Sequence, residues 1–554
     1  MFAPSPSPTA AAIRGGTIYL LNQSEQWNQV DPQRIYTGED FAFFGATTMR
    51  SLTTYEPSPD LTQGTTLAPD LATDLGTSAN GGRTWTFTLR PGGTWQDGAE
   101  ITCEDVKYGV SRSFATDIIN QGPTYAITSL DIATEPDGSS SYKGPYTNIG
   151  QDLYDQAVTC AGRTITFHLK RPSADFNDTV TLGFAPVRRS DDTGETFGMT
   201  PDSLIPSTGP YKIDSYTTGV GGRMILSRNE HWNPASDPIR KAYPDRWEVE
   251  FGVDLSVIDQ RITESAGRDA FAVGYDSMTP ERVRTVFADP ETPLAPFASR
   301  TVPGFDPYVR YYWINVNKVP NVKVRQAMMV ALDRAAIRDI LGGDFFGTFA
   351  DGVLKPNIGL DYAPTGLWTT SFGQPVPDSG DPVLARKLIQ DSGEVVPTLT
   401  FTTPDTPVNK KIVAVVIASL AAAGVSVEYM PPCYGYCSIV FAQDRAAFGS
   451  GGWGADWPSA STVIPALFSD AGGWDLSNVA DPAFNAAIRD VEATADRAER
   501  AQKWQALNRR AVENGWVIPT FFSRSYRMAG TNVGPIYQWP AYQSWPYAEM
   551  YITP

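Results

Sequence analysis

Histidine is scarce in this chain, since His168 and His231 are the only two among 554 residues. A serine or cysteine hydrolase that relies on a histidine base would have to use one of them. His168 lies in an alternating, strand-like run and His231 stands beside Trp232 ahead of a turn, so both are interpreted as structural. The sequence therefore predicts no catalytic residues and a protein that is not an enzyme. A glycoside hydrolase stays an alternative, because 61 acidic residues supply candidate carboxylate pairs without marking any.

Clusters of basic residues are missing, and the formal net charge is -17. Proteins that bind nucleic acid neutralise phosphates with grouped lysine and arginine, and a basic patch serves the same purpose at anionic lipid. Neither kind of partner is expected. The 42% hydrophobic and 19% charged residues are typical of a globular chain. A length of 554 residues predicts two or three domains.

Apolar runs are too short to span a membrane. The longest, from Ile412 to Val427, contains Ser419 and Gly424 and is interpreted as a buried helix followed by a strand. Residues 1–13 are rich in proline, serine and alanine and lack the charged and apolar regions of a signal peptide. We expect a flexible tether there.

Cysteine is limited to four residues. Cys433 and Cys437 are close enough in sequence for a turn to close a small disulfide loop, and Cys103 and Cys160 would then form the second bridge. An even number favours an oxidising, extracytoplasmic setting, although four cysteines allow three connectivities and four buried thiols are a further alternative. A zinc site is disfavoured, because no second pair stands at ligand spacing. The prediction is therefore no metal and no cofactor.

Periodic patterns predict layers of helices and strands. Residues 17–21 and 164–169 are β-rich runs bounded by glycine and proline, which indicates strands. Residues 381–392 predict a helix that opens with Asp-Pro and is followed by glycine. A second helix is predicted at 410–423 and a strand at 424–429. This succession indicates an α/β fold.

The last long helical stretch is predicted at residues 481–514. Within it, Glu499, Arg500 and Lys503 stand at spacings that suit ion pairs on a solvent-facing side. No internal repeat is found.

The segment from Gly452 to Pro458 is the best candidate for a ligand site. It reads Gly-Trp-Gly-Ala-Asp-Trp-Pro, too rich in glycine for a helix interior, and sets a carboxylate between two indoles. A shielded carboxylate needs a cationic partner, which a bound ammonium group would supply. The candidate residues are Trp453, Gly454, Ala455, Asp456 and Trp457. A structural aspartate at a turn or helix cap is the alternative interpretation of Asp456.

Further segments match a known family in content and in order. They are Leu67–Ala72, Thr84–Gly92, Trp95–Gly98, Glu104–Val106, Ser207–Tyr211, Asn229–Trp232 and Val324–Ile337. Together with the segment around Asp456, they resemble bacterial extracellular solute-binding protein family 5. That family comprises the oligopeptide-, dipeptide- and nickel-binding receptors of ABC importers.

The resemblance implies a particular fold and domain order. The fold is α/β, a two-lobed periplasmic-binding-protein fold, class II-like and of cluster C, with an extra β-rich subdomain inserted in lobe I. The implied ranges are 1–13 for the tether, 14–57, 196–306 and 517–554 for lobe I, 58–195 for the inserted subdomain, and 307–516 for lobe II.

The resemblance also implies ligand-binding residues. In peptide-binding members, the aspartate that matches Asp456 holds the α-amino group of the peptide. The loop that contains Glu25, Gln26 and Trp27 matches one that hydrogen-bonds peptide main chain like an added strand. Tyr275 resembles a residue at the end of a lobe I strand near the cleft, with a packed aromatic as the alternative interpretation.

These implications define an expected function. The chain is expected to be a monomeric extracytoplasmic solute-binding protein that captures oligopeptides between two lobes and delivers them to an ABC transporter permease. Relatives from Gram-positive bacteria are lipoproteins, so a lipid-anchored cell-surface location is expected, with a periplasmic one as the alternative. Other ligands stay open: an oligosaccharide, an amino acid or guanidino compound of a biosynthetic pathway, haem, or a nickel chelate.

Overall fold

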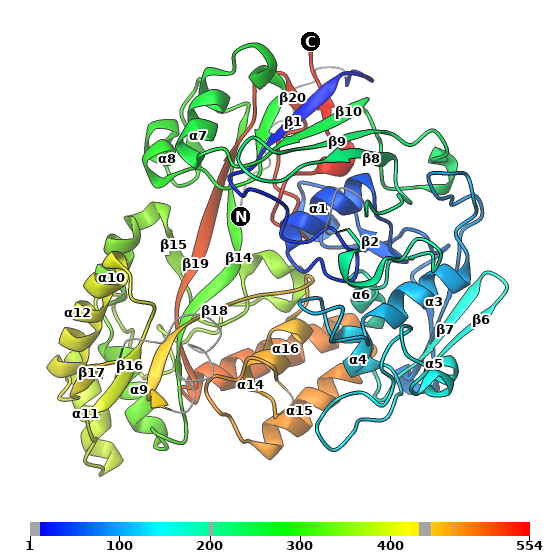
Figure 1. The fold of residues 1–554 in the computed structure, drawn as a ribbon. Helices are drawn as coiled ribbons and strands as arrows, with labels where there is room; N and C mark the ends of the chain where they lie inside the picture. Colours follow the sequence, from blue (N-terminus) through cyan, green and yellow to red (C-terminus); the bar gives the residue numbers. More distant parts are fainter. Residues whose placement is uncertain (1–11, 199–202, 431–444, 471) are drawn as a thin grey trace. The chain divides into compact units, whose positions relative to one another are not determined.

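The chain folds into two compact units in this computed structural model. The structure describes residues 12–198, 203–430, 445–470 and 472–554. Unit 1 consists of Met1–Gly304 and Ser525–Pro554, and unit 2 of Phe305–Arg524. Two long strands, β14 (Thr301–Ile314) and β19 (Val517–Met528), continue from one unit into the other (Figure 1). Unit 2 is somewhat longer at both ends than the lobe II range expected from sequence. Residues 1–11 of the expected tether lie outside the described residues.

The main sheet of unit 1 has five strands in the order β11-β1-β10-β9-β8. Their bounds are Thr17–Leu21 for β1, Tyr211–Tyr216 for β8, Arg223–Arg228 for β9, Arg246–Glu250 for β10 and Ala272–Gly274 for β11. β1 is the strand predicted at residues 17–21, and it buries Ile18 and Leu20 completely. It pairs in parallel with β10 and β11, whereas β9 is antiparallel to both of its neighbours.

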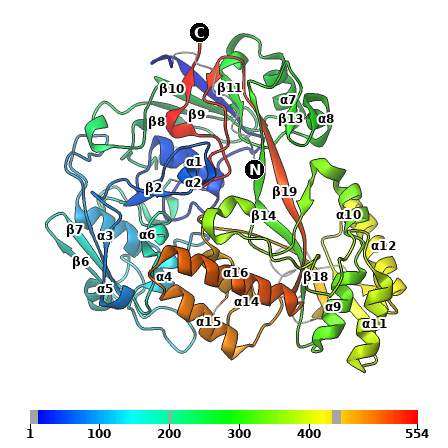
Figure 2. The ribbon, with the colours of Figure 1, turned by 180° about the vertical axis from the view of Figure 1, so that it is seen from behind.

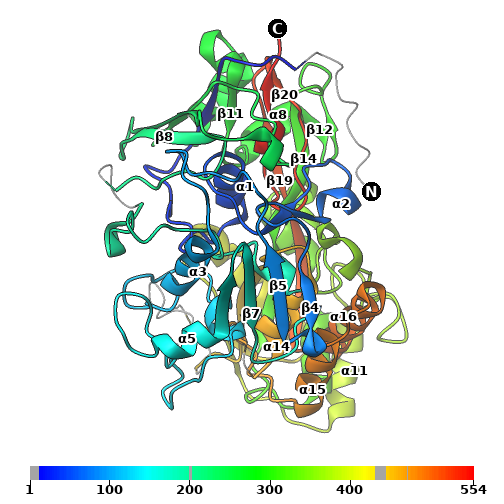
Figure 3. The same ribbon diagram turned by 90° about the vertical axis from the view of Figure 1, so that its right-hand side faces the viewer.

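A second, antiparallel sheet of unit 1 has the order β4-β5-β7-β6, and its strands β4, β5 and β7 run side by side in Figure 3. The strands are β4 (Thr77–Ala79), β5 (Thr84–Thr88), β6 (Val158–Ala161) and β7 (Thr164–His168). Trp85 and Phe87 alternate with exposed or half-exposed threonines, so one face of the sheet is buried. This sheet falls within the range 58–195, whose status as an inserted subdomain stays a prediction.

The remaining elements of unit 1 are short. The helices are α1 (Gly38–Thr47), α2 (Leu61–Gly64), α3 (Cys103–Arg112), α4 (Tyr125–Ser129), α5 (Gln151–Ala157), α6 (Phe176–Thr179), α7 (Leu255–Glu264) and α8 (Pro280–Val286). The small strands are β2 (Thr53–Tyr55), β3 (Leu67–Pro69), β12 (Phe287–Asp289), β13 (Thr292–Pro293), β20 (Val533–Gly534) and β21 (Tyr551–Ile552).

One disulfide joins the start of α3 to β6, between Cys103 and Cys160. This is the bridge expected for these two cysteines. Cys433 and Cys437 lie outside the described residues, so the bridge expected there stays a prediction.

Buried ion pairs join segments of unit 1 that are distant in sequence. Asp70 accepts from Arg50 Nε at 2.7 Å and from Arg240 Nη2 at 2.8 Å, and Arg240 also pairs with Asp237 at 3.1 Å. Burial alone would raise the pKa of Asp237, but the two guanidinium groups lower it well below its ordinary value. The charges compensate one another, so removing one partner would leave a buried charge unpaired.

The sheet of unit 2 has six strands in the order β15-β19-β14-β18-β16-β17. The four further strands are β15 (Gly347–Phe349), β16 (Leu399–Thr402), β17 (Val427–Tyr429) and β18 (Phe448–Gly454). β16 pairs in parallel with both β17 and β18, whereas β14 is antiparallel to β18. The strand predicted at 424–429 is therefore present, although it begins at Val427.

Helices flank this sheet. They are α9 (Val322–Ala331), α10 (Arg334–Leu341), α11 (Pro382–Ser392), α12 (Pro407–Ala422), α14 (Ile464–Phe468), α15 (Pro482–Glu492) and α16 (Arg497–Glu513). α11 confirms the helix predicted at 381–392, because the Asp381 carboxylate accepts from the amides of Val383 and Leu384 at its start. α12 begins three residues before the predicted start, where Thr406 caps it. No helix of the described ranges has the length and apolar character needed to cross a bilayer.

The stretch predicted as one long helix at 481–514 is two helices, α15 and α16, which lie side by side with α14 nearby in Figures 1 and 2. The chain breaks because Asp496 caps a new helix, accepting from the amide of Glu499 at 2.8 Å.

The prediction that Arg500 lies on a solvent-facing side of this stretch is wrong. Its side chain is buried, and Nη1 donates to the carbonyl oxygens of Thr494 at 3.0 Å and Ala495 at 3.4 Å. The pair between Glu499 and Lys503, at 3.0 Å, does lie on the surface as predicted.

Short 3-10 helices complete the described elements. They are η1 (Asn80–Gly82), η2 (Gly194–Thr196), η3 (Pro234–Ser236), η4 (Gly267–Phe271), η5 (Gly343–Phe345), η6 (Pro356–Asp361), η7 (Ala460–Thr462) and η8 (Tyr547–Glu549).

Candidate ligand-binding site

The segment around Asp456 follows directly from β18, an inner strand of the unit 2 sheet. Glycines line β18 because the aromatic rings of β14 lie against its backbone. A Cβ atom on Gly449 would come within 2.4 Å of the Trp313 ring, and one on Gly451 within 2.7 Å of the Tyr311 ring. The glycine-rich sequence is therefore required by close packing, and it fixes the position from which the candidate segment departs.

The two indoles of the segment have different environments. Trp453 is half-buried; its Nε1 donates to the Thr462 carbonyl oxygen at 2.8 Å, and its ring contacts that of Trp474 at a centroid distance of 5.6 Å. Trp457 is only 4% exposed. Trp457 is therefore part of the packed interior, whereas Trp453 keeps part of its ring accessible.

Asp456 is half-buried at a turn that returns to η7. Its amide donates to Thr462 Oγ1 at 3.1 Å, and this hydroxyl donates in turn to the Ser459 carbonyl oxygen at 3.2 Å. The backbone of Asp456 is thus fixed by the turn itself. A half-buried carboxylate on a backbone held this way is suited to pair with a cation.

A fully buried carboxylate, Asp361, supports the same turn. It accepts from the Ser459 hydroxyl at 2.9 Å and from the Ala460 amide at 2.7 Å, and it forms an ion pair with Arg497. The sequence analysis missed Asp361 because it lies about a hundred residues before the turn and carries no local motif. Asp361 is a positioning residue for the candidate site.

The predicted residues of unit 1 form a separate group. Trp27 is 3% exposed, and its ring contacts those of Phe43, Phe44 and Tyr275 at centroid distances of 5.1, 4.9 and 5.3 Å. The structure thus brings Trp27 and Tyr275 together within an aromatic cluster and gives the Trp27 ring a packing role.

The neighbouring loop residues are available to solvent. Glu25 and Gln26 are exposed, and the Glu25 carbonyl oxygen accepts from the Gly219 amide at 2.7 Å. The loop is therefore tied down through its backbone while both side chains project from it. A ligand-binding role for Glu25, Gln26, Trp27 and Tyr275 stays a prediction.

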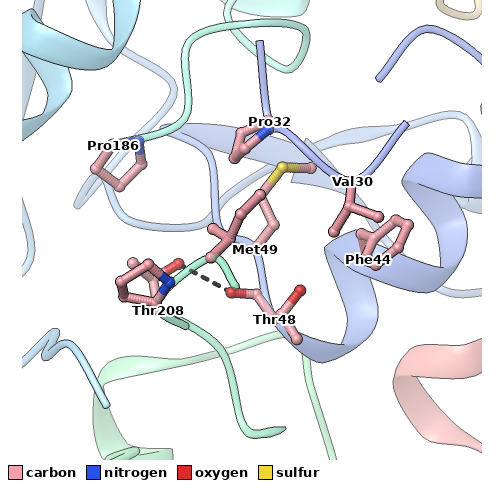
Figure 4. Close-up of a pocket in the computed structure, with 9 residues that line it drawn as sticks. Val30, Pro32, Phe44, Thr48, Met49, Pro186 and Thr208 are labelled. Atoms are coloured by element: carbon pink, nitrogen blue, oxygen red, sulfur yellow. Dashed lines mark hydrogen bonds between the residues drawn. The ribbon is translucent and has the colours of Figure 1, made fainter. Parts of the chain in front are cut away.

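A small pocket lies next to this loop in unit 1 (Figure 4), with a volume of about 280 Å³ that includes open solvent. Its lining is apolar or uncharged: Val30, Pro32, Phe44, Thr48, Met49, Pro186, Ile205, Pro206 and Thr208. The amide of Thr208 donates to the Thr48 carbonyl oxygen at 2.9 Å and closes one side. A pocket without a charged group offers no partner for an ammonium group.

Metal ligands do not gather in the described ranges, where no group of three or more histidine, cysteine, aspartate or glutamate side chains is placed to hold an ion.

Comparison with known proteins defines the class. The family model described as "Bacterial extracellular solute-binding proteins, family 5 Middle" matches residues 66–475, which is well over half of the chain. The chain therefore belongs to family 5 of the bacterial extracellular solute-binding proteins, and its fold is the mixed α/β, two-lobed fold of that family. Members of this family are substrate-binding proteins.

The individual relatives have low sequence identity to this chain, but the matches cover long stretches of it. The periplasmic murein peptide-binding protein MppA of Escherichia coli strain K12 is 21% identical over 466 residues, which is 82% of this chain and 79% of MppA. The oligopeptide-binding protein OppA of Bacillus subtilis strain 168 is 23% identical over 282 residues, 48% of this chain and 45% of OppA. Among solved structures, clavulanic acid biosynthesis oligopeptide binding protein 2 superposes with a TM-score of 0.86 at 27% identity, covering 99% of this chain and 98% of that one.

Proposed function

We propose that this protein captures oligopeptides outside the cytoplasm and delivers them to the membrane-spanning subunits of an ABC importer. The observation that carries the proposal is the half-buried residue Asp456, a carboxylate whose backbone is held at a turn in the segment that also contains Trp453 and Trp457. An ammonium group at the amino end of a peptide is the natural partner for such a carboxylate. The similarity to MppA and OppA, which are a murein peptide-binding and an oligopeptide-binding protein, supports the same ligand class.

The unit 1 residues supply a second part of the proposal. The exposed Glu25 and Gln26 lie on a loop whose backbone is anchored, and the loop leads to the apolar pocket lined by Val30 and Met49. Hydrogen bonds from such a loop to peptide main chain give affinity without dependence on ligand sequence. The proposed receptor would therefore accept peptides of varied sequence.

The test is to identify what the purified chain carries. Native mass spectrometry of the full chain, followed by denaturation and sequencing of released molecules, should yield a mixture of short peptides. Calorimetric titration should then show strong binding of free-amine peptides and weak binding of their N-acetylated forms, because acetylation removes the ammonium charge. Release of one sugar, chelate or haem, with no response to peptides, would contradict the proposal.

A second candidate is recruitment to a biosynthetic pathway. It is favoured by the similarity to clavulanic acid biosynthesis oligopeptide binding protein 2, which extends over almost the full length of both chains. In that case the released molecule would be a single amino acid or guanidino compound and not a peptide mixture. A guanidinium group would suit Asp456 and the neighbouring indole equally well.

A further inference from the structure

A row of aromatic rings lies on one face of the unit 2 sheet. The rings of Trp313 and Tyr311, on β14, cover the glycines that stand opposite them on β18, and both are buried. Trp453 follows the second of these glycines by two residues on β18, so its side chain projects from the same face. Trp453 is only half-buried. The row of rings therefore reaches the surface at Trp453.

Trp474 extends this row from a different segment. Its ring contacts that of Trp453 at a centroid distance of 5.6 Å, with an angle of 40° between the two planes, and Trp474 is half-buried as well. Its backbone amide donates to the Ala466 carbonyl oxygen of α14 at 3.1 Å, and its buried Nε1 turns the pyrrole edge of the indole towards the protein. Two half-buried indoles in contact thus form a platform, defined as Trp453 and Trp474.

The turn that carries Trp474 is fixed by the next residue, Asp475. Its Oδ1 accepts from the amide of Ser477 at 3.1 Å, and its Oδ2 accepts from the amide of Val479 at 2.7 Å. Burial raises the pKa of Asp475 to about 7, although these backbone hydrogen bonds lower it in part. The carboxyl group therefore serves its own turn and has lost much of its hydration. Trp474 is thus held by a rigid support.

Thr462 joins the platform to the candidate ligand site. Its carbonyl oxygen accepts from Trp453 Nε1 at 2.8 Å, and its hydroxyl accepts from the Asp456 amide at 3.1 Å. Because one residue makes both contacts, the Trp453 ring and the Asp456 backbone keep a fixed relation to each other. In a peptide, the α-ammonium group and the first side chain are attached to the same carbon atom. An ammonium group paired with Asp456 would therefore bring the first side chain of the ligand close to the platform.

We propose that the platform of Trp453 and Trp474 receives the first side chain of a bound peptide and selects an aromatic ring there. This inference rests on the proposed function and adds a preference at one position of the ligand. Indoles bind another aromatic ring through stacked or edge contacts, in addition to the apolar area that is buried. A cationic side chain gains less at this place, because Asp475 already uses both carboxyl oxygens for backbone amides and Asp456 is engaged by the ammonium group.

The test compares tripeptides with free ends that differ in their first residue, namely Phe-Ala-Ala, Ala-Ala-Ala and Arg-Ala-Ala, with Ala-Phe-Ala as the control for position. Calorimetry on the full chain measures their affinities. The wild type should bind Phe-Ala-Ala roughly tenfold more tightly than each of the other three. Trp474→Leu keeps apolar bulk and removes the ring, so this ratio should fall to roughly threefold or less while the affinity for Ala-Ala-Ala is unchanged.

Two further variants test whether the ring of Trp474 is responsible. Trp474→Phe retains an aromatic ring and should retain the preference for Phe-Ala-Ala. The matched control is Trp232→Leu, which removes a half-buried indole from unit 1 and should leave all four affinities unchanged.

The other outcomes separate the inference from the proposed function. Equal binding of Phe-Ala-Ala and Ala-Ala-Ala by the wild type would overturn the platform and leave the peptide function standing, as would tighter binding of Arg-Ala-Ala than of Phe-Ala-Ala. An equal loss for all four peptides in Trp474→Leu would also overturn it, because a merely structural residue acts on all of them alike. Binding of no peptide by the wild type would overturn the proposed function, and the inference with it.

Discussion

The phenol of Tyr275 donates a hydrogen bond of 2.6 Å to Oδ1 of Asp40, a residue of α1 that is 2% exposed. Burial raises the pKa of Asp40 to about 6, although the hydrogen bonds from Tyr275 and Thr37 lower it in part. The Tyr275 ring also contacts Trp27. Tyr275, a residue predicted to bind ligand, is therefore oriented by a carboxyl group whose pKa is raised to about 6.

Asp40→Asn should remove the contribution of this carboxyl group to the pH dependence of the free energy of unfolding. The pKa of this carboxyl is about 6 in the folded chain against an ordinary 3.8, so the folded state binds the proton more tightly than the unfolded state does. Stability is then lost as pH rises, and the wild type should lose about 3 kcal/mol relative to Asp40→Asn between about pH 3 and pH 7. Urea unfolding of both proteins across this range measures the difference. A difference that is constant with pH would contradict the prediction.

Loss of the disulfide should destabilise unit 1. Cys103 and Cys160 are 57 residues apart, and opening a loop of this size restores entropy to the unfolded chain worth about 4 kcal/mol. The double variant Cys103→Ala, Cys160→Ala should therefore unfold at a lower urea concentration than the wild type. Cys160→Ala alone should behave like the double variant. A change below about 1 kcal/mol would show that the loop is already constrained in the unfolded state.

Asp456→Asn keeps the shape of the side chain and removes its charge. If an ammonium group of the ligand pairs with Asp456, the variant should lose about 2–4 kcal/mol of binding free energy for free-amine peptides. Asp391→Asn, at an exposed position in the last turn of α11, is the matched control and should bind as the wild type does. Calorimetry with the same peptide measures both variants. Unchanged affinity of Asp456→Asn would contradict the proposal that Asp456 pairs with the ammonium group of the ligand.

Two glycines of β18 should respond differently to alanine. A Cβ on Gly449 would lie 2.4 Å from the Trp313 ring and 2.8 Å from Thr402 Cγ2, whereas the nearest atom to a Cβ on Gly452 is the movable end of Arg310 at 3.2 Å. Gly449→Ala should cost about 1–3 kcal/mol of stability through overpacking, and Gly452→Ala less than about 1 kcal/mol. Thermal or urea unfolding compares the pair directly. Equal losses would show that the strand adjusts as a whole.

Local signals predicted the local structure well. The sequence of α11 shows both of its ends, since Asp381 stands before the first turn and Gly393 follows the last, and β1 is a short β-rich run that follows glycine. The break between α15 and α16 was missed because the apolar spacing continues through it, although Asp496 is a capping residue. Arg500 was placed in solvent because its acceptors, Thr494 and Ala495, become available only when the first helix ends.

Some residues of the candidate site could be identified from the sequence and others could not. The Asp456 segment carries a compact motif, so it could be identified from sequence. Asp361 could not, because it reaches Ser459 and Ala460 across about a hundred residues of sequence and stands in no distinctive pattern. The Trp27 ring could not be placed either, since Phe43 and Tyr275 meet it only after β1, α1 and β11 have assembled.

Because β19 carries the chain from unit 2 back into unit 1, the two units receive their last residues at different times during synthesis. Unit 2 is one uninterrupted stretch, so every residue it needs has been made once Arg524 has been added. Unit 1 includes Met1–Gly304, which precede unit 2, yet it buries Trp545 and Met550 completely, and both are made after Arg524. The part of the chain that is made first is thus the last to be finished, and its long amino-terminal portion must wait with an incomplete core until residues 525–554 emerge.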